Sequence, residues 1–82
     1  MIDWAHDAEL DARGLACPLP VLKARKRLRG LVPGHRLLVE ATDPMAAIDI
    51  PHMCKEDGHR LLASESADNM YRFLIERVRE HP

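Results

Sequence analysis

The spacing of the hydrophobic residues predicts a first helix near the start of the chain. Over residues 18–29, apolar positions recur at intervals of three and four, which places Val21, Ala24 and Leu28 on one helical face. Leu31 follows on the same side. The remaining circumference is largely basic. We therefore expect an amphipathic helix over residues 18–29, packed through its apolar face.

A second helix is predicted after Asp43, because an aspartate at the N-cap followed by Pro44 favours a helix start. Gly58 is suited to end the helix, which gives a span of residues 44–57. Pro51 lies inside this span. It removes a backbone donor and crowds the preceding turn, so it is expected to kink or split the helix.

Alternation with a period of two predicts strands in the rest of the chain. Tyr71, Phe73 and Ile75 fall on one side of an extended segment. Residues 37–39 are apolar without interruption, which indicates a strand buried on both faces. Strands are expected at residues 8–12, 35–41, 59–65 and 70–78.

The order βαβαββ predicts a two-layer α/β (α+β) sandwich, in which two helices cover one face of a four-stranded mixed sheet. The opening βαβ unit favours parallel pairing of the first two strands, and the short last turn favours an antiparallel hairpin. With 82 residues, the chain has room for one domain, residues 1–82, with a core over about residues 9–78.

Charge is distributed unevenly, although the net charge is only −1. The first residues are acidic, whereas residues 23–36 contain several cations and no acid, which indicates a local docking surface. No apolar run is long enough to span a membrane, and the acidic start does not resemble a signal peptide. We therefore expect a cytoplasmic protein with reduced thiols and no membrane partner.

Cys17 is the candidate reactive residue. If Pro18 is the first helical residue, Cys17 is the N-cap, and its sulfur can accept the N–H of Leu19 at the positive end of the helix. Both effects would lower the thiol pKa into a range of roughly 3.5–7.5, and Arg13 could add to them. The prolines, Pro18 and Pro20, would stiffen the turn. The alternative is that Cys17 is a small buried core residue beside a well-capped helix.

Cys54 is expected to be packed core, because it shares a helical face with Ala47 and Ile50. A Cys17–Cys54 disulfide is disfavoured in a reducing compartment. A zinc site would have to use both cysteines with His52 and His59, and no C-x₂-C pair is present to begin one. Neither a metal nor a cofactor is therefore expected.

Two segments of the sequence resemble a known protein family. The segment "LDARGLACPLPVLKARKRL" is similar to the N-terminal signature of the TusA/SirA-like (YhhP-like) sulfur carriers, with a Cys-Pro-x-Pro motif at residues 17–20 preceded by Gly14. The segment "TDPMAAIDIPHMCKEDGH" resembles the second helix of that family. Leu19 occupies the x position, where the branch associated with tRNA 2-thiouridine commonly has an acid.

The resemblance implies a sulfurtransferase-type carrier rather than a free-standing turnover enzyme. Cys17 would accept sulfane sulfur as a persulfide from a cysteine desulfurase or rhodanese-type donor and pass it to an acceptor protein. The relay could serve tRNA thiolation, molybdenum cofactor maturation or sulfur metabolism. The family fold agrees with the sandwich expected from the residue pattern.

The basic helix is the candidate partner surface, because a partner must approach Cys17 over its first turns. Its contact residues would be Lys23, Lys26, Arg27, Leu19 and Leu22. Direct binding of nucleic acid by the carrier is not expected. A rival interpretation is a non-catalytic regulatory module that docks on acidic protein or RNA through the same helix, and a third is a redox-sensing thiol.

Overall fold

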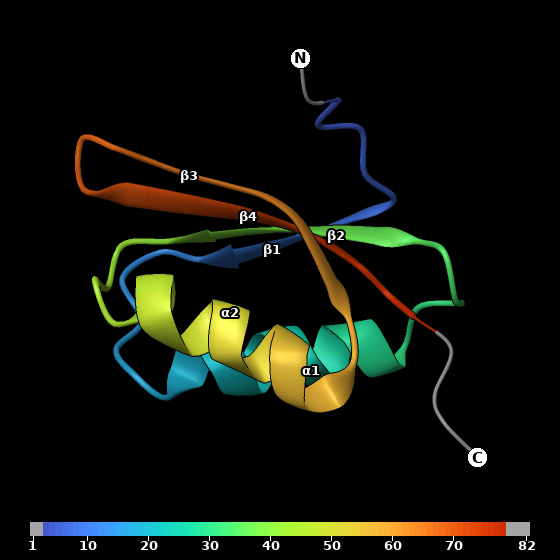
Figure 1. Ribbon diagram of the computed structural model, residues 1–82. Helices are drawn as coiled ribbons and strands as arrows, with labels where there is room; N and C mark the ends of the chain where they lie inside the picture. The colour runs from blue at the N-terminus through green and yellow to red at the C-terminus, as the bar shows by residue number, and fades with distance from the viewer. Residues whose placement is uncertain (1–2, 79–82) are drawn as a thin grey trace.

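The computed structural model describes residues 3–78 and consists of a four-stranded sheet with two helices on one face (Figure 1). The predicted order βαβαββ and the two-layer architecture are confirmed. The elements are β1 (Ala8–Ala12), α1 (Leu19–Arg29), β2 (Arg36–Ala41), α2 (Ala46–Asp57), β3 (Arg60–Ala67) and β4 (Met70–Glu76).

The strands lie in the order β1-β2-β4-β3, so the sheet is mixed. β1 and β2 are parallel, with Leu10 opposite Val39, whereas β4 runs antiparallel to both β2 and β3. The β3–β4 turn is made by Asp68 and Asn69, both with positive φ. Such residues suit the tight hairpin turns that match strand twist. The predicted parallel and antiparallel pairings are therefore both correct.

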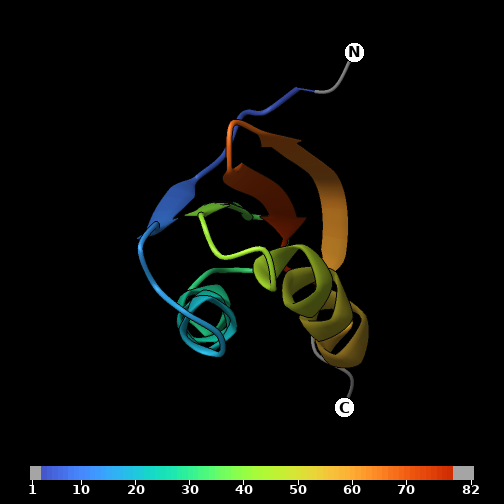
Figure 2. The ribbon, with the colours of Figure 1, turned by 90° about the vertical axis from the view of Figure 1, so that its left-hand side faces the viewer.

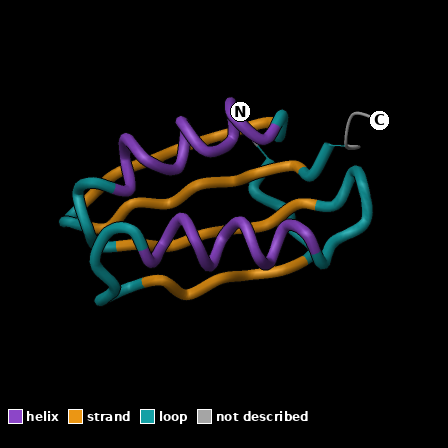
Figure 3. The backbone as a smooth tube through the Cα atoms, turned by 90° about the horizontal axis from the view of Figure 1, so that it is seen from below, coloured by secondary structure: helices purple, strands orange, loops and turns teal. Residues whose placement is uncertain are grey.

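The core lies between the sheet and the helices. α1 packs on β1 and β2, and α2 packs on β3 and β4, with the two helices side by side (Figures 2 and 3). The predicted apolar faces of the first helix and the last strand line this core, with Val21, Leu31 and Tyr71 at its margin. Its largest fully buried side chains are Leu28, Leu37, Ile50, Met53, Ile75 and Val39.

Both helices begin later than the sequence predicted. The N-cap of α1 is Pro18 rather than Cys17, and α2 starts at Ala46, with Met45 as its N-cap. The buried face of α2 contains Ala46, whereas Ala47, which was predicted to share this face, is exposed. α2 continues through Pro51 to Asp57, so the prediction that this proline would split the helix is wrong.

The opposite face of the sheet is partly covered by the segment that precedes β1 (Figure 1). Leu38 and Leu74 are paired across β2 and β4, lie outside the cluster that faces the helices, and are nevertheless buried. This confirms that β2 is buried on both faces. The guanidinium of Arg72 lies 4.8 Å from the centre of the Trp4 ring, a cation–π contact that ties the N-terminal segment to β4.

Over residues 3–78, no helix combines the length and the apolar character needed to cross a membrane.

Candidate functional site

Cys17 lies in the loop between β1 and α1, at the edge of the sheet where β1 and β2 both end. Because these strands are parallel, the loops that follow them meet there. The N–H of Gly14 donates to Oγ1 of Thr42 over 2.9 Å, and the N–H of Cys17 donates to Oδ2 of Asp43 over 2.6 Å. The loop that carries the thiol is therefore fastened to the loop that leads into α2.

The Cys17 side chain is exposed, so the alternative of a buried core cysteine is wrong. Its S–H donates to Oδ2 of Asp49, in the first turn of α2, over 3.0 Å. The sulfur thus lies at the junction of the two helices. It borders a cleft of about 290 Å³ that is lined by Cys17, Pro18, Val21, Arg25, Asp49, His52, Met53 and Glu56.

The electrostatic surroundings of the sulfur are acidic. The pKa of the Cys17 thiol is raised above its ordinary value, chiefly by the hydrogen bond to Asp49, and then by desolvation and by the negative charges of Asp49 and Asp43. The opposite shift was predicted from the helix N-terminus. That prediction is wrong because the N–H of Leu19 donates to the Ala16 carbonyl over 2.9 Å instead of to the sulfur.

Arg13 does not offset these acids. Its guanidinium donates to both carboxylate oxygens of Asp11, over 2.8 and 3.0 Å, and this pairing lowers the pKa of Asp11 to about 2. Arg13 was expected to stabilise a Cys17 thiolate. Its guanidinium instead forms an ion pair with Asp11 of β1. Gly14 has a φ of 79°, which favours glycine at the turn that follows.

The two prolines of the motif lie on either side of an exposed leucine. Pro18 follows a cis peptide bond from Cys17, and Pro20 occupies a buried position in the first turn of α1. Leu19, between them, is 44% exposed, and Leu22 is 50% exposed. The turn therefore presents apolar surface beside the thiol.

Cys54 is in the core, as predicted, and its side chain is buried within the cluster between α2 and the sheet. Burial raises the pKa of its thiol to about 11. Both cysteines are free. His52 lines the cleft near Cys17, whereas Nδ1 of His59 accepts the N–H of Val78. Within residues 3–78, no three His, Cys, Asp or Glu side chains converge as a metal site.

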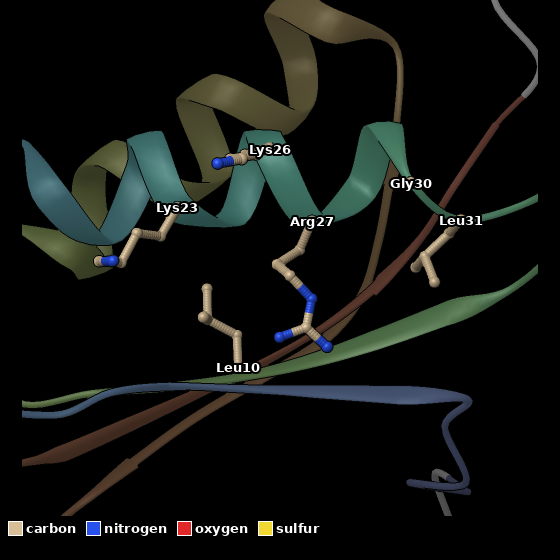
Figure 4. A pocket seen from close by; sticks show the side chains of 6 residues that line it. All are labelled: Leu10, Lys23, Lys26, Arg27, Gly30 and Leu31. Carbon is tan, nitrogen blue, oxygen red and sulfur yellow. The ribbon is translucent and has the colours of Figure 1, made fainter.

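Four basic residues of α1 lie on two different sides of the helix. Arg25 faces α2, where Nε donates to Asp57 over 2.7 Å and Nη2 lies 3.7 Å from Glu56, so it does have balancing acids. Lys23, Lys26 and Arg27 lie on the flank of α1 that faces away from α2. With Leu10, Gly30 and Leu31 they line an open groove of about 580 Å³ beside β1 (Figure 4).

Asp43 and Asp49 are the site residues that sequence reasoning missed. The sequence predicts Asp43 only as an N-cap. In the structure its two carboxylate oxygens accept the N–H groups of Met45 and Cys17, and these hydrogen bonds lower its pKa. Asp49 received no role. A signal was available, because the predicted parallel βαβ unit requires the loop after the first strand to meet the loop after the second.

Comparisons with known proteins identify the family and the fold of the chain. Residues 8–77 match the family described as sulfurtransferase TusA. The fold is similar to the crystal structure of a SirA-like protein from Desulfitobacterium hafniense, with a TM-score of 0.78 and 23% sequence identity, over 89% of this chain and all of that one. The structural likeness shows the shared fold, and the family match covers all six elements of the sandwich. The chain belongs to the sulfurtransferase TusA family.

Proposed function

We propose that this protein is a sulfur carrier that accepts sulfane sulfur on Cys17 as a persulfide and passes it to an acceptor protein. The observation that carries the proposal is the contrast between the two thiols. Cys17 is exposed at the meeting point of both helices, whereas Cys54 is buried in the core. A relay needs a thiol that two successive partners can reach, and Cys17 meets that requirement.

The transfer conserves atoms and electrons. The sulfur of Cys17 attacks the outer sulfur of a donor persulfide, a new S–S bond forms, and the old S–S bond breaks. The electron pair of the broken bond stays with the donor thiolate, which takes up the proton released by Cys17. The chemistry is that of thiol–disulfide exchange, so neither a cofactor nor an external oxidant is required. Transfer to the acceptor repeats the step with Cys17 as the donor.

The donor in this proposal is a cysteine desulfurase or a rhodanese-type protein, and the acceptor is a second protein thiol. The side chains of Lys23, Lys26 and Arg27 form no hydrogen bond or ion pair with other residues of the described chain, so they are available to an acidic partner. Leu19 and Leu22 supply apolar contact near the sulfur. We place the relay in the cytoplasm, where both thiols would remain reduced.

The test is intact mass after incubation with a cysteine desulfurase and cysteine. We expect a gain of one sulfur atom, about 32 Da, that a reductant removes and that Cys17→Ser abolishes. Cys54→Ala is the matched control and should keep the adduct. If no sulfur adduct forms with the desulfurase, a rhodanese or a small-molecule persulfide, the proposal is wrong and a non-catalytic docking module becomes the better interpretation. Oxygen adducts on Cys17 would indicate a redox sensor instead.

A further inference from the structure

The carboxylate of Asp49 is the group in contact with the reactive atom. Oδ2 of Asp49 accepts the S–H of Cys17 over 3.0 Å, and its side chain is half-buried at the wall of the cleft. The other nearby carboxylate, Asp43, is already engaged by two backbone N–H groups. The acid placed to exchange a proton with the sulfur is therefore Asp49.

The other ionisable side chains around the cleft contact one another. From α1, Arg25 reaches Asp57 and Glu56. From α2, Nε2 of His52 lies 3.6 Å from Oε1 of Glu56. These pairings leave the sulfur with a carboxylate as its hydrogen-bond partner, and such a partner stabilises the protonated thiol. Cys17 at rest is thus a thiol that must lose its proton during the reaction.

We propose that Asp49 is a catalytic residue of sulfur transfer, acting as the general base that takes the proton of Cys17 while its sulfur attacks. This inference rests on the proposed carrier function. Before the step, Cys17–SH is hydrogen-bonded to the Asp49 carboxylate, and the donor is a protonated persulfide, R–S–SH. The proton moves to Oδ2 as the sulfur lone pair forms the bond to the outer sulfur.

The R–S bond to that outer sulfur breaks in the same step, and its electron pair leaves on the donor thiolate. The thiolate then takes the proton from Asp49. The balance is Cys17–SH + R–S–SH → Cys17–S–SH + R–SH, and the carboxylate is regenerated. A carboxylate is too weak a base to ionise the resting thiol, but the S–H proton becomes much more acidic as the sulfur donates its electrons.

The experiment compares two rates in Asp49→Asn, because general-base catalysis and simple suppression of the thiolate predict opposite outcomes. The first rate is alkylation of Cys17 by iodoacetamide, which requires thiolate. The second is sulfur loading from cysteine persulfide, followed by intact mass. We expect Asp49→Asn to alkylate faster than wild type, since the thiol pKa falls, yet to load sulfur more slowly by about tenfold or more.

Glu56→Gln is the matched control, because it removes one negative charge from the same cleft without touching the sulfur. Both of its rates should remain near those of wild type. Asp49→Ala provides a second variant, whose loading rate should rise with added formate, a small carboxylate that can enter the vacated space. Far-UV circular dichroism checks that each variant keeps the native fold.

Three results would overturn the inference. Loading in Asp49→Asn could rise in step with alkylation, which would make Asp49 only a suppressor of the thiolate. Both rates could stay at wild-type values, which would mean that the hydrogen bond has no effect in solution. Formate could fail to accelerate Asp49→Ala. A wild-type protein that accepts no sulfur would instead refute the carrier function, so the two failures are distinguishable.

Discussion

The chemistry of Cys17 depends on two carboxylates that lie 26 and 32 positions further along the chain. Asp43 accepts a hydrogen bond from the backbone N–H of Cys17, and Asp49 accepts one from its S–H group. The positive end of α1 contributes less than its position suggests, because Ala16 takes the Leu19 N–H and the prolines have none. The acidic partners raise the pKa of the Cys17 thiol, so the property that favours reaction at Cys17 over Cys54 is its exposure.

This distinction gives a prediction for thiol reactivity. Native protein treated with iodoacetamide should be modified at Cys17 well before Cys54, because the Cys54 side chain is 2% exposed and its thiol pKa is raised to about 11. Peptide mass spectrometry over a time course measures both rates. Unfolding in denaturant is the control and should make the two rates similar. Equal rates in the native protein would contradict the assignment of Cys54 to the core.

At the scale of elements, apolar periodicity together with capping and turn signals was sufficient to predict every helix and strand and the buried face of α1, and the order of the elements predicted the mixed pairing. These patterns did not predict the residues at which the two helices begin. The Asp43 side chain was read as a cap, but it bridges to Cys17, and α2 begins three residues later. In addition, Ala46 is buried where Ala47 was expected. Propensity cannot anticipate such a shift, because the competing partner is distant in sequence.

The register of α2 is testable with two isoleucines in the same helix. Ile50 is fully buried, so Ile50→Ala should lower the free energy of unfolding by about 2–5 kcal/mol. Ile48 is 64% exposed, so the same substitution there should change it by less than about 0.5 kcal/mol. Urea titrations of the two variants and the wild type make the comparison. Similar losses at both positions would show that α2 is rotated relative to the sheet.

On the scale of the whole molecule, the fold places the cationic side chains of α1 in two different surroundings. Arg25 is neutralised against α2, whereas Lys23, Lys26 and Arg27 point to the opposite flank, where Arg27 reaches toward β1 in Figure 4. Cys17 lines the cleft that contains Asp49 and Glu56, and the basic groove lies on the other flank of α1. A protein with a net charge of −1 can thus attract an acidic partner to one side of its thiol.

Charge reversal tests whether the groove guides the donor. Lys23→Glu combined with Arg27→Glu should slow sulfur transfer from a desulfurase at low salt by about tenfold, and should flatten its dependence on ionic strength. Loading from cysteine persulfide should be unchanged, because a small donor needs no docking surface. The control is Lys55→Glu with Arg60→Glu, which makes the same change of charge in the last turn of α2 and at the start of β3. If the Lys23/Arg27 variant accepts sulfur from the desulfurase at the wild-type rate, the groove has no role in docking the donor.

The contact between Trp4 and Arg72 has an optical consequence. Trp4 is the only tryptophan of the chain, and its ring contacts Arg72 of β4. It belongs to the N-terminal segment, which lies on the side of the sheet away from the helices (Figure 1). Its fluorescence is therefore sensitive to whether the N-terminal segment is seated on β4. Chemical modification of the thiol takes place on the other side of the sheet. The protein thus carries an intrinsic fluorophore for following its folding while Cys17 is chemically modified.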